Sequence, residues 1–312
     1  MNYNPFQFKF KKKENFLSII IPVYNDPKGL KITLSSLKKI LPDNKHEIIV
    51  VNDGANKNIA SIAKNFRTNL VSISPNCGSY FARNRGIEYS KGEFIAFLDA
   101  NIEVTHDWYD KGIESIKKYD YIGGKIVIDD SNINTITKLF EFKTAFLVKN
   151  YLEKNHYAPT TNLLIKRNII KKIGGFNEKL KSGGDFEFGN RVYRNNFKQY
   201  YNPKMIVIHP PRDLKEKIKK MKRISKGEKK LKNIHPKLSN HFKFHFKYIL
   251  PPRLSTIKTD KNFDFSFLEK FFGFWGLKLC NFYYKYIYKS FIKNRNTCKS
   301  FSKPKIKYYK NY

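Results

Sequence analysis

The chain has 312 residues, of which 41% are hydrophobic, and a formal net charge of +35. This apolar content suffices for one large core, or for a core with a smaller appendage. No run of about eighteen uncharged apolar residues occurs, which argues against a transmembrane helix, and the first fifteen residues lack the apolar run of a secretory signal. The cysteines Cys77, Cys280 and Cys298 are far apart. No disulfide framework or cysteine metal site follows from them, and a reducing cytoplasm is expected.

The positive charge is concentrated in the last hundred residues. Residues 213–312 contain 27 Lys or Arg and 6 Asp or Glu, a net charge of +21. Such a field attracts polyanions, which include anionic lipid headgroups, nucleic acid and anionic glycans. Lys, Asn, Ile and Tyr are abundant throughout, so a residue bias of the whole genome is an alternative explanation.

Predicted strands and helices alternate through the first hundred residues. Residues 17–23 (LSIIIPV) form a continuous apolar run, typical of a strand buried on both faces. A helix is expected over 27–40, with Asp26 as its cap and Pro27 in its first turn. Further strands are predicted at 47–51, 69–73 and 93–98, and further helices at 59–66 and 79–89. This alternation implies an α/β fold with a mostly parallel, doubly wound sheet flanked by helices.

The pattern is less regular after residue 121. Strands are predicted at 162–165 and 205–208, and a helix at 186–195. After Arg212 the composition shifts sharply to lysine, which indicates a boundary. We therefore expect three regions: a basic N-terminal lead (1–16), a catalytic domain (17–212) and a basic, mainly helical C-terminal region (213–312).

Polar clusters stand at the ends of four predicted strands. They are Tyr24-Asn25-Asp26, Asn52-Asp53-Gly54, the 76–86 segment and Asp99-Ala100-Asn101. Ligands of open parallel sheets bind at the carboxyl ends of the strands, so the four together indicate one site. Taken singly, each cluster would also suit an ordinary turn.

Asp99 and Asn101 are candidate metal ligands. Oxygen side chains two residues apart can face one hard cation such as Mg²⁺ or Mn²⁺, which would bridge diphosphate oxygens. Asn101 offers a neutral oxygen, so this pair is weaker than two carboxylates. His209 ends an apolar strand and is a further candidate ligand, with a structural histidine as the alternative.

Two further segments suit phosphate binding and proton transfer. Arg83 and Asn84 lie on a predicted helix that starts near Gly78, and both helix N-termini and arginines favour phosphate. A solvated basic helix is the alternative. Asp185, after Gly183-Gly184, could take a proton from an acceptor hydroxyl as general base. The alternative for Asp185 is a helix N-cap.

In this order the clusters resemble family 2 glycosyltransferases of the GT-A type. The resemblance runs from about Ser18 to Arg212. It includes SIIIPVYND, EIIVVNDG, NCGSYFARNRGIEYSKGEFIAFLDAN, TTNLLIKR and IGGFNEKLKSGGDFEFGNRVYRNNF. The run HPPRDLKEKIKKMKRISKG looks like the continuation seen in bacterial members whose base motif is SGGD-x-EFG.

The resemblance implies a role for each matching position. The nucleotide sugar would contact Pro22, Tyr24, Asn25, Asp53, Gly78, Arg83, Asn84 and Asp99. The metal ligands would be Asp99, Asn101 and His209; Asp185 would be the general base, with Glu187 and Arg191 as supporting residues. Two positions depart from the family pattern: Asn101 replaces the second aspartate of the metal motif, and Gly184 stands where many relatives carry glutamate.

The implied activity is inverting transfer of a sugar from a nucleotide-diphosphate sugar to a hydroxyl acceptor, with Mn²⁺ or Mg²⁺, in cell-surface polysaccharide or glycolipid synthesis. An inactive sugar- or nucleotide-binding relative is one alternative, but it would not explain the presence of both Asp99 and Asp185. A polyanion-binding protein is the other, and it would explain the charge but not the four polar clusters. The contacts that select donor and acceptor are expected in residues 129–159.

Residues 271–292 predict an amphipathic helix. At about 100° per residue, Lys278, Lys285, Lys289 and Lys293 fall in one narrow sector beside many large apolar side chains. Such a helix would lie in a membrane interface with its lysines at anionic headgroups, or pack on the catalytic domain. Residues 215–232 form a second basic patch. We expect a cytoplasmic enzyme, peripheral on the cytoplasmic face of the membrane, whose acceptor can be lipid-linked and whose polyanionic partner is lipid rather than nucleic acid.

Overall fold

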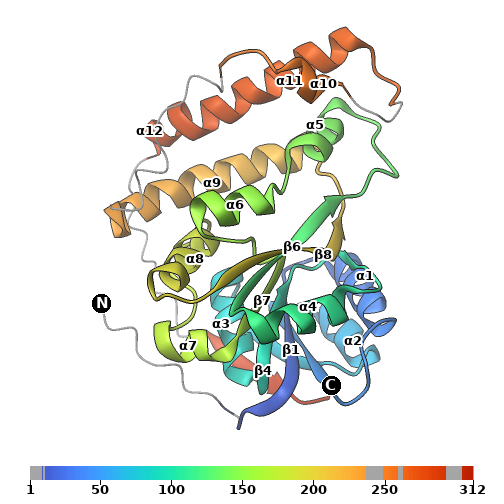
Figure 1. Ribbon diagram of the computed structural model, residues 1–312, viewed down its shortest axis with the longest axis vertical. Coiled ribbons are helices and arrows are strands. Elements are labelled where there is room, and N and C mark those ends of the chain that lie inside the picture. The colour runs from blue at the N-terminus through green and yellow to red at the C-terminus, as the bar shows by residue number, and fades with distance from the viewer. Residues whose placement is uncertain (1–8, 10, 237–248, 259–262, 293–303, 312) are drawn as a thin grey trace.

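The computed structural model describes residues 9, 11–236, 249–258, 263–292 and 304–311 (Figure 1). The strands are β1 (Lys13–Val23), β2 (His46–Asp53), β3 (Asn69–Ser74), β4 (Gly92–Leu98), β5 (Glu103–Val104), β6 (Tyr121–Ile128), β7 (Asn162–Lys166), β8 (Gln199–His209) and β9 (Lys305–Tyr309). The helices of the catalytic part are α1 (Pro27–Lys38), α2 (Lys57–Asn65), α3 (Ser79–Tyr89), α4 (Trp108–Lys118), α5 (Ile136–Thr144), α6 (Val148–Asn155), α7 (Arg167–Ile173) and α8 (Gly184–Arg194). They are followed by α9 (Leu214–Ile234), α10 (Leu254–Ile257), α11 (Phe267–Phe282), the π-helical segment η3 (Tyr283–Tyr288) and α12 (Lys289–Phe291).

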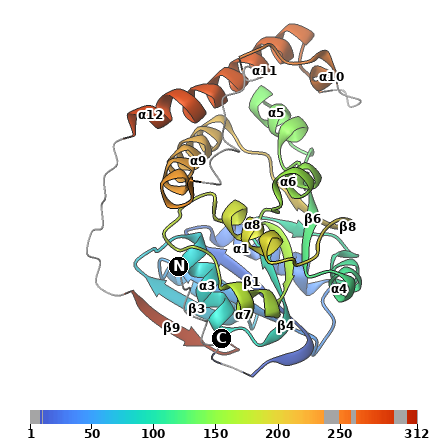
Figure 2. The same ribbon diagram turned by 60° about the vertical axis from the view of Figure 1, so that its left-hand side comes forward.

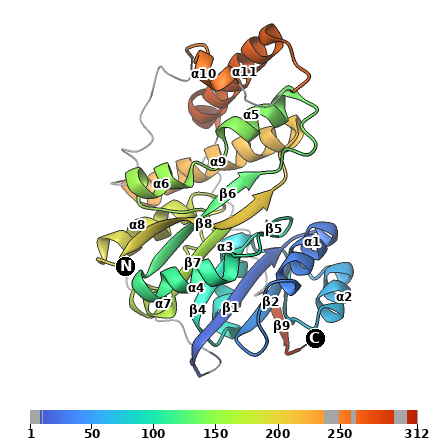
Figure 3. The ribbon, with the colours of Figure 1, turned by 45° about the vertical axis from the view of Figure 1, so that its right-hand side comes forward.

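One mixed sheet organises the molecule, in the order β5-β8-β6-β7-β4-β1-β2-β3-β9. Its centre, β3-β2-β1-β4, is parallel, and the apolar run of β1 is buried as a strand covered on both faces must be. Helix α1 starts as predicted, with Pro27 in its first turn and the Asp26 carboxylate accepting from the Gly29 N–H at 2.9 Å. The expected doubly wound, mostly parallel sheet flanked by helices is confirmed (Figure 3).

An antiparallel strand interrupts the parallel order beside the proposed site. Strand β7 runs antiparallel to both β4 and β6, and its register pairs Leu98 with Asn162. The residue before Asn162 is therefore brought next to the residue after Leu98, which is Asp99. Beyond β7 lie the parallel pair β6–β8 and the short edge strand β5, which is antiparallel to β8.

The C-terminal region is mainly helical, as expected, but part of it belongs to the sheet. Strand β9 pairs antiparallel with β3, and Tyr308 stacks on Tyr89 of α3 at 4.5 Å between ring centroids (Figure 2). Helix α9 lies between the sheet and the layer formed by α10, α11 and α12 (Figure 1). Helix α11 packs on α5 through a small second core made of Leu139, Phe140, Ile257, Phe274 and Leu277. Among the described residues, none of the helices is both long and apolar enough to span a membrane.

Candidate active site

Asp99, directly after β4, is the centre of the polar cluster. Its Oδ1 accepts from the Arg83 guanidinium at 2.7 Å, and its Oδ2 accepts from the Thr161 hydroxyl at 2.7 Å. The Arg83 side chain is 5% exposed and the Asp99 side chain 37%, so Arg83 is fixed in the protein while Asp99 can meet a ligand. Burial works against ionisation of Asp99. The charge of Arg83 and the hydrogen bond from the Thr161 hydroxyl outweigh that effect and lower its pKa.

Asp185 lies in the first turn of α8 and is held by the neighbouring threonine. The Thr160 hydroxyl donates to Asp185 Oδ1 at 3.1 Å, and the Tyr80 hydroxyl accepts from the Gly184 N–H at 3.0 Å. The helix cap is Gly183, at φ 81° and without a side-chain cap bond. The N-cap alternative for Asp185 is therefore wrong. Burial raises the pKa of Asp185; the charge of Arg83 opposes this rise and that of Asp99 adds to it.

Asp53 organises the loop before α3. Its Oδ1 accepts from the Cys77 N–H at 2.7 Å, and its Oδ2 accepts from the Gly78 N–H at 2.8 Å and from Asn76 Nδ2 at 2.9 Å. Gly78 caps α3 at φ 98°, a backbone conformation that favours glycine. Asp53 is 3% exposed and its pKa is raised by burial, which the two backbone N–H groups partly offset. Its observed contacts fix the loop.

The predicted nucleotide-binding residues of the first cluster lie at the end of β1. Pro22 is half-buried, Asn25 is exposed, and Tyr24 is 56% exposed. The ring of Tyr24 lies so close to Gly54 that a Cβ at position 54 would stand 2.9 Å from it. The carbonyl oxygen of the Asn25 side chain accepts from Asn56 at 3.2 Å. Tyr24 thus presents an open aromatic surface beside the turn that follows β2.

The side chains of Asn84, Glu187 and Arg191 make hydrogen bonds within the protein rather than facing an open site. The Asn84 amide donates to the Phe176 carbonyl at 2.8 Å and accepts from the Phe176 N–H at 2.9 Å, and the residue is 2% exposed. Arg191 pairs with Glu187 at 2.6 Å and also donates to the carbonyls of residues 173 and 175. The structure therefore brings Arg83, Asp99 and Asp185 together and uses Asn84 and the Glu187–Arg191 pair to hold the loop around residue 176.

The predicted metal ligands Asp99, Asn101 and His209 offer a carboxylate, an amide and an imidazole. Burial, with the charge of Arg212, lowers the pKa of His209 to about 4, so the ring is neutral at physiological pH, as a metal ligand must be. Its Nε2 lies 3.0 Å from the Arg212 guanidinium. Within the described part of the chain, no group of three His, Cys, Asp or Glu side chains could hold a metal. The donor chemistry fits Mn²⁺ or Mg²⁺, with one carboxylate as its anionic member.

Cations of α9 and of the segment before it lie near the candidate site, and the sequence did not predict them there. Arg212 pairs with the buried Glu141 at 3.1 Å, and Lys217 binds the other oxygen of the same carboxylate. Burial and the charge of Arg212 lower the pKa of Lys220 to about 7, and the charge of Arg223 reaches both Asp99 and Lys220. The sequence could not identify these cations, because the whole region is rich in lysine. Charge alone does not distinguish a buried lysine or arginine near the site from one on a solvent-exposed helix face.

Thr160 and Thr161 were also missed. Both lie in the TTNLLIKR segment that carries the resemblance, yet a hydroxyl that holds a carboxylate from another element has no local sequence signature. Because Thr160 and Thr161 are adjacent, the carboxylates of Asp185 and Asp99 are bound by neighbouring residues of one loop.

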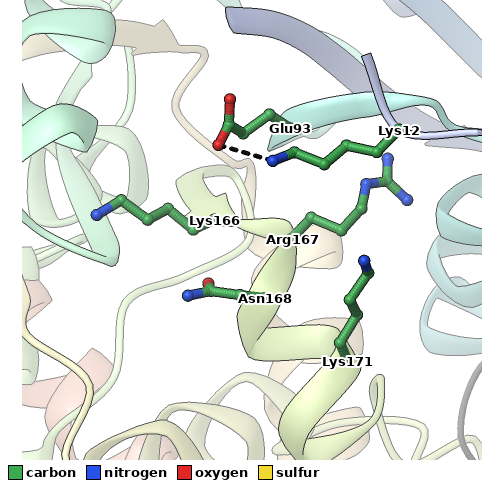
Figure 4. Close-up of a pocket in the computed structure, with 6 residues that line it drawn as sticks. All are labelled: Lys12, Glu93, Lys166, Arg167, Asn168 and Lys171. Atoms are coloured by element: carbon green, nitrogen blue, oxygen red, sulfur yellow. Dashed lines mark hydrogen bonds and ion pairs between the residues drawn. The ribbon is translucent and has the colours of Figure 1, made fainter. Parts of the chain in front are cut away.

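A basic hollow of about 200 Å³ lies elsewhere, at the start of β4 (Figure 4). It is lined by Lys12, Glu93, Lys166, Arg167, Asn168 and Lys171. Glu93 pairs with Lys12 at 3.0 Å. Glu93 lies near the start of β4, whereas Asp99 follows the end of that strand. The hollow and the candidate site therefore lie at opposite ends of β4.

Comparison with known proteins agrees with the geometry. Residues 18–174 match the family described as Glycosyl transferase family 2. The glycosyltransferase AglE of Haloferax volcanii is 30% identical over 68% of this chain and 73% of its own length. The poly-beta-1,6-N-acetyl-D-glucosamine synthase of Staphylococcus epidermidis is 32% identical over 34% of this chain and 27% of its own length.

Two solved structures share the fold. The mannosyltransferase PcManGT from Pyrobaculum calidifontis, in complex with GDP-Man and Mn²⁺, is 14% identical with a TM-score of 0.55, over 74% of this chain and 68% of its own. S. aureus TarS 1–349 in complex with UDP-GlcNAc is 19% identical with a TM-score of 0.52, over 68% and 66%. With the family match and the AglE similarity, the chain belongs to glycosyltransferase family 2 and has the GT-A fold.

Proposed function

We propose that this glycosyltransferase inverts the configuration of the transferred sugar, with Asp185 as general base and with Asp99 and Arg83 at the donor diphosphate. One observation carries the proposal: the adjacent Thr160 and Thr161 hold the two carboxylates, and Arg83 acts electrostatically on both. Two carboxylates with opposite pKa shifts suit two different tasks. The catalytic domain in this proposal comprises residues 17–212.

The reaction is a single displacement. Asp185 takes the proton of the acceptor hydroxyl, whose oxygen forms a bond to the anomeric carbon while the bond from that carbon to the diphosphate oxygen breaks. The raised pKa of Asp185 brings its proton affinity closer to neutral pH, as general-base catalysis requires. Arg83 and the cations of α9 stabilise the negative charge that develops on the leaving diphosphate.

Asp99, Asn101 and His209 would hold the divalent metal. When bound, the metal neutralises charge on the diphosphate oxygens. Asn101 is set by the backbone: its φ is 67° and its N–H donates to the Gly29 carbonyl at 3.1 Å. A Cβ at Gly29 would stand 2.6 Å from the Cβ of Asn101, so glycine at position 29 lets α1 approach the metal motif. With an amide in place of the second carboxylate, the proposed site binds metal more weakly than an Asp-x-Asp pair would.

The proposed donor is a nucleotide-diphosphate hexose, because UDP-GlcNAc and GDP-Man occupy the two structures of the same fold. The proposed acceptor is a hydroxyl of a cell-surface glycan or glycolipid, which the similarity to a polysaccharide synthase supports. The net charge of +35 supports a place at an anionic membrane surface, on its cytoplasmic face.

The test is donor turnover followed by the stereochemistry of the product. The purified chain is incubated with UDP-GlcNAc, UDP-glucose or GDP-mannose, an alkyl glycoside as hydroxyl acceptor, and Mn²⁺, and released nucleoside diphosphate is measured. We expect turnover of at least one donor, and an NMR spectrum that shows a β linkage in the product of an α-linked donor. Absence of turnover with every donor would support the inactive relative, and a retained configuration would contradict the single displacement.

A further inference from the structure

The outermost helical layer exposes apolar side chains along its whole length. In α11, η3 and α12 they recur every three or four residues, the period of one helix face. They are Leu268, Phe272, Leu279, Tyr283, Ile287 and Phe291, with exposed fractions of 64%, 60%, 40%, 44%, 41% and 75%. Between Phe272 and Leu279 the line passes Gly276, which is also exposed. We call this line the α11 face; at 1.5 Å per residue it is roughly 35 Å long.

The opposite side of these helices fixes them on the protein. Phe274 is fully buried and packs edge-on against Phe140 of α5, at 5.1 Å between ring centroids. Lys289 pairs with Glu228 of α9 at 2.9 Å. The α11 face is therefore turned away from the rest of the molecule. The helices that carry it form the outermost layer in Figures 1 and 2.

The expected lysine stripe does not form the outer face. Lys289 is held by Glu228, and Lys278 donates to the Pro251 carbonyl at 3.1 Å; Lys293 is outside the described residues. Lys278 and Lys289 thus turn toward the protein, as the packed alternative expects, while the apolar line turns outward.

The neighbouring segment extends the surface and supplies exposed charge. The Trp275 indole donates to the Ile249 carbonyl at 2.8 Å, which places the segment 249–258 beside α11. In this segment Leu250 and Leu254 are each 59% exposed, and Arg253 is also exposed.

We propose that the α11 face docks in the interface of an anionic lipid bilayer, with its apolar side chains at the acyl boundary and Arg253 among the headgroups. An apolar helix face with cations beside it is the arrangement of interfacial helices. The net charge of +21 in residues 213–312 disfavours a second copy of this chain as occupant, because the two surfaces would repel each other, and favours an anionic one.

The helices that carry this face are connected to the proposed active site by a series of contacts. Helix α11 packs on α5, whose Glu141 binds Arg212, and Arg212 contacts His209. The inference deepens the membrane part of the proposed function and rests on it for the identity of the acceptor, whereas lipid binding itself requires no catalysis.

Vesicle flotation of the full chain, without donor or metal, tests the proposal. Phosphatidylcholine vesicles are compared with vesicles that contain 30 mol% phosphatidylglycerol. The variant Phe272→Ser/Phe291→Ser changes two exposed side chains of the α11 face. The control Ile32→Ser/Leu214→Ser changes two exposed apolar side chains elsewhere, 41% and 49% exposed. Circular dichroism confirms that both variants are folded.

We expect binding to anionic vesicles that the α11-face variant weakens at least tenfold and the control leaves unchanged. Equal binding by the two variants, or no binding of the unmodified chain, would overturn the proposal. Concentration-dependent dimerisation that the α11-face variant abolishes, without vesicle binding, would instead identify the face as a contact between copies. Because flotation needs no turnover, its failure is distinguishable from failure of the proposed chemistry.

Discussion

Two carboxylates in one site have their pKa values driven in opposite directions. Burial acts on both, but Asp99 contacts the Arg83 guanidinium and the Thr161 hydroxyl, which together lower its pKa. Asp185 accepts from Thr160 and has no cation in contact among the described residues, so burial dominates and raises its pKa. Asp99 thus stays ionised to meet a cationic partner or a metal, while Asp185 is suited to exchange a proton.

Replacement of Asp185 by Asn keeps the size of the side chain but removes its proton affinity. We expect kcat to fall by at least about a hundredfold, the low end for loss of a general base, with donor KM nearly unchanged. In the unmodified enzyme, activity is lost as pH falls through the raised pKa of Asp185, because the protonated form cannot accept the hydroxyl proton. The loss of activity at low pH is measured from the pH profile of kcat. Asp107→Asn, an exposed aspartate, is the control; an unfolded Asp185→Asn chain would point to a structural role.

Metal dependence at Asp99 is the second prediction at this scale. Asp99→Ala removes the one carboxylate of the proposed ligand set and should abolish turnover. Asn101→Asp adds a second carboxylate, so less Mn²⁺ should be needed for half-maximal rate. The measurement is turnover during titration of Mn²⁺ into EDTA-treated enzyme. Full turnover by the EDTA-treated enzyme without added metal would refute the ligand assignment.

Candidate site residues could be proposed from the sequence where the local sequence carries a signal. Asp53, Asp99 and Asp185 follow strands or glycines and could be located by position alone. Thr161 could not, because its contact with Asp99 depends on the antiparallel register of β7 against β4. Asn84 was expected at the donor, and its contacts with Phe176 depend equally on tertiary packing.

At the scale of elements, the regular βα repeat was predictable and the inserted elements were not. Helices α1 and α3 and strands β1 to β4 lie where the alternation of apolar runs and turns predicts them. Strand β6 was not predicted because its sequence mixes Gly, Tyr and Lys, which no single period explains. Helix α4, which precedes it, was not predicted either. Strand β9 (KIKYY) is short and basic, and its place beside β3 depends on a partner more than two hundred residues away.

Helix α9 makes a prediction about pH dependence through Lys220. Burial and neighbouring cations lower the pKa of this side chain to about 7, so it loses its charge as pH rises past neutrality. If Lys220 contacts the donor diphosphate, kcat/KM should fall as pH rises through about 7. In Lys220→Arg the guanidinium remains charged, and the alkaline decline should disappear. Lys215→Arg, exposed on the same helix, is the control. An unchanged decline in Lys220→Arg would exclude this lysine as its cause.

At the scale of the whole molecule, α9 joins the catalytic part more closely than a boundary after Arg212 suggests. Leu231 is fully buried in the main core, 3.6 Å from where a Cβ of Gly183 would lie. Gly227 lies against Ser182, and a Cβ there would stand 2.6 Å from the Ser182 carbonyl oxygen. Helix α9 therefore packs against Ser182 and Gly183, which immediately precede the helix that carries Asp185.

This packing predicts that the proposed catalytic domain depends on α9 for stability. Leu231→Ala should lower the free energy of unfolding by about 2–5 kcal/mol, the usual cost of truncating a buried leucine. Leu279→Ala, on a side chain 40% exposed, should cost much less.

A chain that ends at residue 212 should unfold at lower denaturant than one that ends at residue 236, since the shorter chain also removes Lys217 from the buried Glu141. Chemical denaturation followed by circular dichroism measures the stability of the two variants and of the two truncated chains. If the two truncated chains unfold at the same denaturant concentration and Leu231→Ala leaves the free energy of unfolding unchanged, α9 is an appendage. The domain boundary then lies at residue 212.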